Sequence, residues 1–148
     1  FIDGSGGKYL HMPAGGSLLP ANHDTIDKKM HYLKQEGKTV YKYAVKKMAD
    51  VCLKILERNG LSGKDIKLFI PHQANKRIID AAAQRCGFTE KQVLININKY
   101  GNTTAGTIPI GLDEAVEDGT IQNGDLILLS AFGAGFSWGS MLLRWGVN

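Results

Sequence analysis

The stretch between residues 65 and 106 constrains the fold most, because two apolar, strand-like runs alternate there with helical patterns. The run Ile66–Ile70 precedes a predicted helix over Gln73–Cys86. The run Val93–Ile97 precedes a predicted helix over Ala105–Glu117. Strand, helix, strand and helix in this order predict parallel strands, whose carboxyl ends meet at one edge of a sheet. Open α/β sheets bind their ligands at that edge.

The remaining patterns complete an α/β chain. Apolar residues at spacings of three and four predict a long amphipathic helix between residues 37 and 59. Residues 125–130 and 138–145 predict two strands joined by a tight corner, and we expect them to be antiparallel. A short strand is predicted over residues 8–12, whereas residues 24–36 fit either a helix or an extended segment.

Length and charge set wide bounds on function. A chain of 148 residues is long enough for one domain with a buried core. Its formal net charge of +4 suits a nucleic acid, an anionic cofactor, an acidic protein or a membrane surface equally well, so the charge alone selects no partner. No apolar run reaches the roughly 18 residues of a membrane span, and no signal-peptide pattern opens the chain. We therefore expect a cytoplasmic protein that does not enter a membrane.

The two cysteines, Cys52 and Cys86, match no disulfide framework and no metal-binding spacing. Each falls on the apolar face of a predicted helix. A nucleophilic thiol needs exposure and an electropositive environment. We therefore expect both cysteines to be core residues, and the sequence predicts no metal site.

Two polar residues follow the two predicted strands, His72 after the first and Asn102 in the loop after the second. Alone, a histidine is often structural, and an asparagine beside a glycine often forms a turn. At a shared sheet edge, however, a neutral imidazole and a side-chain amide would make two neutral donors that stabilise an oxyanion. The corner at residues 132–136 either adds a backbone amide or is glycine-rich for steric reasons alone. No nucleophile accompanies these groups.

Lys38, Lys42 and Lys46 recur every four residues and therefore share one face of the predicted helix. This face is either merely solvated or a basic binding surface. The lysines are not interleaved with aromatic residues on an exposed strand, so a nucleic acid is the least favoured partner.

Three segments resemble the signature blocks of the β-ketoacyl-acyl-carrier-protein synthase III family. They are residues 70–75 (IPHQAN), 100–105 (YGNTTA) and 131–139 (AFGAGFSWG), and they occur in the family's order. The resemblance runs from Asp3 to Trp145 and implies a thiolase-like fold of two similar halves. It implies that residues 1–148 are the C-terminal half, an α/β unit with a mixed, mostly five-stranded sheet and helices on both faces.

The resemblance also implies an activity, the decarboxylative Claisen condensation that initiates fatty acid synthesis. In the family, a cysteine of the N-terminal half takes an acyl group from acyl-CoA, usually acetyl-CoA. Malonyl-carrier protein then loses carbon dioxide, and the resulting carbanion attacks the acyl-cysteine. His72 and Asn102 match the catalytic residues that hold the malonyl thioester oxygen as enolate charge develops. Asparagine rather than a second histidine at position 102 indicates the initiating type.

Binding positions follow from the same resemblance. Ala134 matches the residue whose backbone amide stabilises the acyl oxyanion. Asn75 and Gly37 match positions along the pantetheine arm of CoA. Lys42 and Arg77 fall where the family is basic and binds the acidic acyl carrier protein.

The resemblance implies no cofactor besides the CoA thioester and malonyl-carrier-protein substrates, and a homodimer for the complete enzyme. Because neither Cys52 nor Cys86 occupies the nucleophile's position, the isolated chain is predicted to be inactive. Two alternatives stay open. One is another thiolase-fold acyltransferase or condensing enzyme, and the other is a non-catalytic module that binds CoA or carrier protein.

Overall fold

A three-stranded mixed sheet forms the centre of the computed structural model, which describes residues 1–146. The strands are β3 (Leu68–Pro71), β4 (Leu126–Gly133) and β5 (Ser137–Arg144), in the order β3-β4-β5. β3 and β4 are parallel, and β4 and β5 are antiparallel, so the predicted antiparallel pair is confirmed.

Single bridges extend this sheet at both edges. Ile2 pairs with Ser137 of β5, and Val93 pairs in parallel with Phe69 of β3. Counting these two bridged segments, five segments of the chain take part in the sheet, as expected, but only three of them are full strands. The prediction of a complete strand over 93–97 is wrong. Beyond Leu94, whose amide donates to the Phe69 carbonyl at 2.9 Å, the chain leaves the ladder and turns into the short helix α4 (Ile97–Tyr100).

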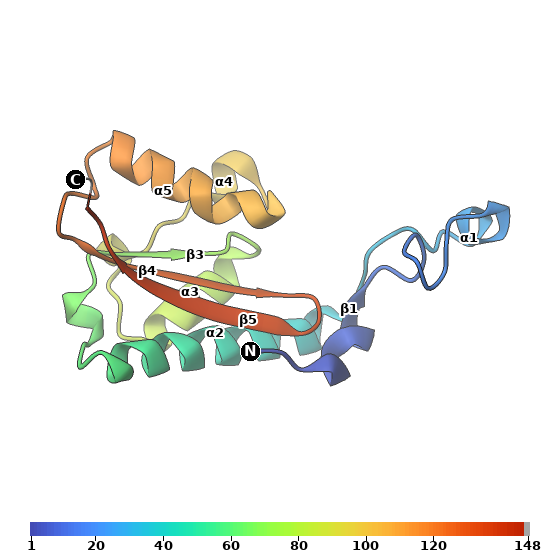
Figure 1. Ribbon diagram of the computed structural model, residues 1–148, viewed down its shortest axis with the longest axis horizontal. Coiled ribbons are helices and arrows are strands. Elements are labelled where there is room, and N and C mark those ends of the chain that lie inside the picture. The colour runs from blue at the N-terminus through green and yellow to red at the C-terminus, as the bar shows by residue number, and fades with distance from the viewer. Residues whose placement is uncertain (147–148) are drawn as a thin grey trace.

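Helices cover both faces of the sheet, as Figure 1 shows. α2 (Gly37–Arg58) and α3 (Lys76–Arg85) lie on one face, and α5 (Thr107–Glu117) lies on the other beside β3. The mixed α/β architecture expected from the sequence is thus confirmed. Short 3-10 helices lie in the connections: η1 (Gly4–Tyr9), η2 (Gly63–Asp65), η3 (Glu90–Gln92) and η4 (Thr104–Gly106).

The long helix α2 forms where its periodicity predicted. Val40, Ala44, Met48 and Leu56 are buried on one face, at the spacing that faces a single side of a helix. Gly60 follows the C-cap residue with φ 64°, the left-handed backbone that a glycine adopts at no steric cost. Fully burying each large apolar side chain contributes about 1.5–3 kcal/mol, so this face anchors the helix to the sheet.

An arm of residues 10–35 projects from this body (Figure 1). It comprises β1 (Leu10–His11), α1 (His23–Asp27) and β2 (Lys34–Gln35), with β1 and β2 antiparallel. Residues 24–36, which fitted two alternatives, are thus a short helix followed by an extended segment. The strand predicted over 8–12 shrinks to two residues because the preceding residues form η1, capped by the side chain of Asp3.

The segment before the arm is tied to the corner between β4 and β5. The amide of Asp3 donates to the Phe136 carbonyl at 2.8 Å, and the amide of Phe136 donates to the Asp3 carbonyl at 2.7 Å. The Phe136 ring is fully buried, and a Cβ on Gly6 would come within 2.3 Å of it. Gly6 therefore lets the N-terminal segment approach the corner closely.

Among residues 1–146, no helix combines the length and the apolar character that a membrane span requires.

Candidate active site

A cavity of about 850 Å³ opens at the carboxyl ends of β3 and β4. Four of the sequence-predicted site residues line it: His72, Asn75, Asn102 and Ala134. His72 directly follows β3, and Ala134 directly follows β4. Because β3 and β4 are parallel, these two positions meet at the same sheet edge, where the sequence led us to expect a ligand site.

His72 is held at its backbone and at its ring. Its amide donates to the Ser130 carbonyl at 2.8 Å, which continues the pairing of β3 with β4. Its ring atom Nδ1 lies 2.7 Å from Oγ1 of Thr107, the first residue of α5. Burial lowers the pKa of the imidazole, because the charged form loses more hydration than the neutral one. The ring is therefore neutral around pH 7.

Asn102 lies in the loop between α4 and α5, with its side chain fixed by an Asx turn. Its Oδ1 accepts the Thr104 amide at 3.0 Å, so the carbonyl end of the side chain is occupied. Thr104 adopts φ 53°, which costs a non-glycine residue about 1–2 kcal/mol. Asn102 lines the cavity, and within residues 1–146 its Nδ2 has no hydrogen-bond acceptor of the chain.

Gln73, next to the histidine, is a residue whose importance the sequence did not reveal. Its side chain is completely buried. Nε2 donates to the carbonyls of Pro71 (2.9 Å) and Leu94 (3.1 Å). Oε1 accepts the amides of Asn96 (3.1 Å) and Ile97 (3.2 Å). The side-chain amide of Gln73 thus joins the end of β3 to the segment that leads to Asn102.

These bonds also explain why 93–97 is not a strand. In a strand, the backbone amides of Asn96 and Ile97 would donate to neighbouring strands. Here both donate to the side-chain oxygen of Gln73 instead. The predicted helix over 73–86 begins late for a related reason. Residues 73–75 form the turn that buries Gln73, and α3 starts at Lys76. A polar residue between two apolar segments was the only sequence signal, and it does not distinguish a buried glutamine from an exposed one.

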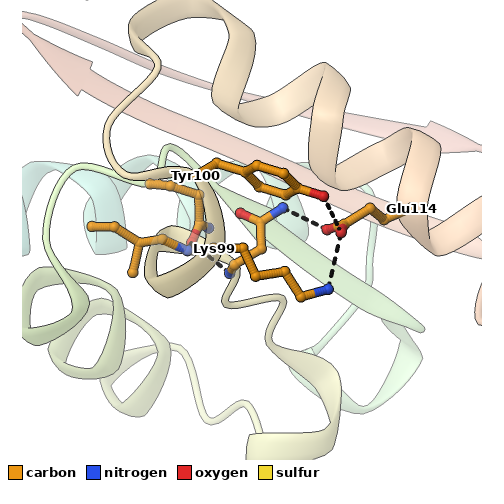
Figure 2. A network of polar contacts seen from close by, with 6 residues as sticks. Lys99, Tyr100 and Glu114 are labelled. Atoms are coloured by element: carbon orange, nitrogen blue, oxygen red, sulfur yellow. Dashed lines mark hydrogen bonds and ion pairs between the residues drawn. The ribbon is translucent and has the colours of Figure 1, made fainter.

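A carboxylate fastens α4 to α5 (Figure 2). Glu114 of α5 accepts hydrogen bonds from Asn96 Nδ2 at 2.8 Å, Tyr100 Oη at 2.7 Å and Lys99 Nζ at 3.0 Å. These donors, Asn96 first, then Tyr100 and Lys99, lower the pKa of Glu114 to about 2. The loop that carries Asn102 is therefore anchored by the two helices that flank it.

Asn75 and Ala134 complete the predicted part of the lining. Asn75 caps α3, because its Oδ1 accepts the Arg77 amide at 2.9 Å. Ala134 lies in the β4–β5 corner, where its carbonyl accepts the Ser137 hydroxyl at 2.9 Å. The left-handed backbone of this corner falls on Gly135, at φ 142°, so Ala134 needs no glycine-like geometry.

Gly37, Lys42 and Arg77 do not line the cavity. Gly37 is the exposed first residue of α2, and a Cβ there would meet nothing within 4 Å. Lys42 is exposed on the same helix, and the Arg77 guanidinium lies 5.4 Å from the ring centroid of Tyr41. The basic residues of α2 and α3 are therefore neighbours on the surface rather than inside the site.

Both cysteines are buried and free, and neither lines the cavity. The Cys86 side chain, together with burial, raises the pKa of Cys52 far above its ordinary value. The expectation that both are core residues is confirmed. Within residues 1–146, no group of three or more His, Cys, Asp or Glu side chains is arranged to hold a metal ion.

Known proteins resemble this chain in both sequence and structure. Residues 56–145 match the model of the 3-oxoacyl-[acyl-carrier-protein] synthase III C-terminal family. The β-ketoacyl-[acyl-carrier-protein] synthase III of Koribacter versatilis is 56% identical over 144 residues, which cover 97% of this chain and 43% of that protein. The enzyme of the same name from Solibacter usitatus is 55% identical, covering 97% of this chain and 44% of that one.

Solved structures agree. The 3-oxoacyl-[acyl-carrier-protein] synthase III of Aquifex aeolicus aligns with a TM-score of 0.84 and 39% identity, over 98% of this chain and 42% of that chain. The priming β-ketosynthase of the R1128 polyketide pathway aligns with a TM-score of 0.84 and 33% identity, over 99% and 43%. These likenesses confirm the thiolase-like α/β fold. The chain spans less than half the length of these relatives, and it belongs to the β-ketoacyl-[acyl-carrier-protein] synthase III family.

Proposed function

We propose that residues 1–148 are the C-terminal catalytic half of an initiating β-ketoacyl-carrier-protein synthase. The complete protein condenses acyl-CoA, in particular acetyl-CoA, with malonyl-carrier protein in fatty acid synthesis. A cysteine outside this chain carries the acyl group. Loss of carbon dioxide from the malonyl group leaves its electron pair on the thioester as an enolate. The enolate carbon attacks the acyl-cysteine, expels the thiolate and forms the 3-ketoacyl product.

One observation carries this proposal: His72 and Asn102 line a single cavity, and a hydrogen bond to a neighbouring threonine holds each of the two side chains. The negative charge of the enolate develops on the malonyl thioester oxygen. Two neutral donors stabilise that oxygen without attracting the ground-state carboxylate as strongly as a full positive charge would. Donors fixed beforehand act more strongly than water, because they need not reorganise as the charge appears.

The remaining site residues receive supporting roles. The backbone amide of Ala134 stabilises the oxyanion formed when the acyl-cysteine is attacked. Asn75, and less directly Gly37 at the start of α2, border the pantetheine arm of CoA. Lys42 and Arg77 bind the acidic carrier protein, which suits their exposed position on neighbouring helices. The complete protein is a homodimer that uses no cofactor besides its thioester substrates.

The decarboxylation half-reaction tests the roles of His72 and Asn102. In the complete protein, His72→Ala and Asn102→Ala should each slow carbon dioxide release from malonyl-carrier protein about 10²–10³-fold, the usual cost of one oxyanion donor. His23→Ala is the matched control, because His23 lies exposed in the arm. A wild-type rate in the His72 variant would remove His72 from the mechanism.

The purified 148-residue chain should show no condensation, since its two cysteines are buried away from the cavity. Turnover by this chain alone would contradict the division of roles proposed above.

Carrier-protein docking is tested by affinity. Lys42→Glu and Arg77→Glu should weaken binding of acyl carrier protein, with the loss shrinking at high salt. Lys64→Glu, in η2 at the other end of α2, should leave the affinity unchanged. Equal effects of all three substitutions would indicate general charge attraction instead of a docking site.

A second candidate is a condensing enzyme of another pathway that uses the same chemistry on a different acyl group. The 33% identity to a priming polyketide synthase favours considering it. The acyl-CoA selectivity of the complete protein separates the two, since a fatty acid initiator should prefer a short acyl chain such as acetyl.

A further inference from the structure

A second hollow, of about 550 Å³, opens at the opposite edge of the sheet, where β3 and β4 begin and β5 ends. In Figure 1 this is the end of the sheet that lies away from the arm. Four cationic side chains line the hollow: Lys64 in η2, Lys67 just before β3, Lys91 in η3 and Arg144 at the end of β5. The hollow shares no lining residue with the cavity of the candidate active site.

These four cations lack ion-pair partners among residues 1–146, whose ion pairs involve other lysines. Arg144 is held in place by a neutral group, because its Nη1 donates to the Gly124 carbonyl at 2.7 Å. This bond positions the guanidinium without cancelling its charge. The four cations therefore keep their attraction for an anion that comes from outside the chain.

Two carboxylates also line the hollow, and both are bonded within the chain. Asp65 Oδ2 accepts the amide of Ser62 at 2.7 Å and its hydroxyl at 2.8 Å. Asp125 Oδ2 accepts the amide of Gln122 at 2.8 Å. Each carboxylate thus serves a local turn and forms no ion pair with the four cations within residues 1–146. The lining as a whole has a net charge of +2.

Size and lining indicate what kind of anion fits. Pockets that bind small molecules measure about 300–1,000 Å³, and the hollow falls in this range. No aromatic side chain of residues 1–146 lines it, so a nucleobase would find no ring to stack on. Phosphate oxygens, in contrast, form strong charge-assisted hydrogen bonds with lysine and arginine. Because the cations come from four separate segments, two linked phosphates reach more of them than a single phosphate does.

We propose that this hollow binds a small molecule through a diphosphate group, and that Lys64, Lys67, Lys91 and Arg144 hold that group. The site is independent of the function proposed above, because it lies at the other edge of the sheet and shares no residue with the candidate active site.

Titration with inorganic pyrophosphate, without a divalent cation, tests where such an anion binds. In nitrogen-15 NMR spectra of the 148-residue chain, the backbone amides of residues 64–67, 91–92 and 124–126 should shift and saturate. The amides around His72 and Lys42 should stay in place. Shifts confined to the region of His72 or Lys42, or shifts that do not saturate, would overturn the proposal.

Calorimetry of the complete protein measures how much the cations contribute. Lys67→Gln combined with Lys91→Gln should weaken pyrophosphate binding about tenfold or more, since two charge-assisted contacts are lost. The matched control is Lys8→Gln combined with Lys29→Gln, which removes the same charge from exposed lysines outside both hollows and should keep the wild-type affinity.

All four replaced lysines are exposed, so both double variants should keep the wild-type melting temperature. Equal losses of affinity in the two double variants would overturn the proposal, because general charge attraction would then explain the binding. Orthophosphate that binds as tightly as pyrophosphate would overturn the choice of a diphosphate.

Discussion

Replacing Gln73 by leucine should loosen the connection between the two catalytic positions. Leucine has a similar size, but it has no group to receive the amides of Asn96 and Ile97, both of which bond to Gln73 Oε1. The carbonyls of Pro71 and Leu94 lose their bonds to Nε2 at the same time. The substitution thus removes four hydrogen bonds at a fully buried position.

The free energy at stake can be worked from these contacts. Each buried donor left without an acceptor costs about 1–3 kcal/mol, so two amides cost about 2–6 kcal/mol. Burial of the leucine side chain offsets about 1.5–3 kcal/mol of this. Taking the middle of each range, the Gln73→Leu chain should lose about 2 kcal/mol of unfolding free energy, a substantial part of the about 5–15 kcal/mol typical of a domain.

Chemical denaturation of the 148-residue chain measures this loss, and NMR of the His72 ring and the Asn102 side-chain amide shows whether the site moves. Gln92→Leu is the matched control. Gln92 Nε2 donates to the carbonyls of Gly63 (2.8 Å) and Ile66 (2.6 Å), away from the cavity. The control should also lose stability, but it should leave the His72 and Asn102 signals in place.

The reasoning would be refuted if Gln73→Leu unfolded within about 0.5 kcal/mol of the wild-type chain. It would also be refuted if both variants shifted the His72 and Asn102 signals equally, since the site would then respond to general loosening and not to the Gln73 connection.

Three further predictions concern pH, packing and thiols. Glu114 has a folded pKa of about 2, below its ordinary value of 4.5, so its contribution to stability should be complete above about pH 4.5 and disappear as the pH falls toward 2. Denaturation curves should show that Glu114→Gln is less stable than the wild-type chain at pH 7 and that this difference shrinks over the same pH range. A difference that stays constant with pH would contradict an ionic role. Gly6→Ala should lower the free energy of unfolding by about 1–3 kcal/mol, because the added Cβ would overlap the buried ring of Phe136. Gly4→Ala should leave the stability unchanged, because its Cβ would meet nothing within 4 Å. Equal melting temperatures of the two variants would refute this. Cys52 and Cys86 should resist a thiol reagent in the folded chain and react only in denaturant. Mass spectrometry of the labelled protein measures this, and rapid labelling of the folded chain would mean that the core opens.

Local sequence patterns predicted the elements whose hydrogen bonds are local. The spacing of apolar residues gave α2 its extent, and the glycine after it marked its end. The pair β4 and β5 was predictable for the same reason, since a tight corner joins them. His72 could be singled out because it directly follows an apolar run, and Asn102 because it lies beside Gly101 in the loop after the next apolar run.

The tertiary structure decided what depends on distant partners. Residues 93–97 have the composition of a strand, but Gln73, more than twenty residues earlier, takes two of their amides and turns the chain into α4. The contact between His72 and Thr107 spans 35 positions, so no periodicity reveals it.

By itself, then, the sequence determined the α/β order of elements, the core faces and the two polar residues at the sheet edge, because apolar periodicity and turn chemistry act over a few residues. Only the tertiary structure decided that the edge is a cavity, which polar atoms are left free to face it, and that Gly37, Lys42 and Arg77 lie outside its lining. The physical reason is that a buried hydrogen-bonding group needs a partner, and the fold often supplies that partner from a distant part of the chain. The residues next to the group in the sequence therefore do not identify its partner.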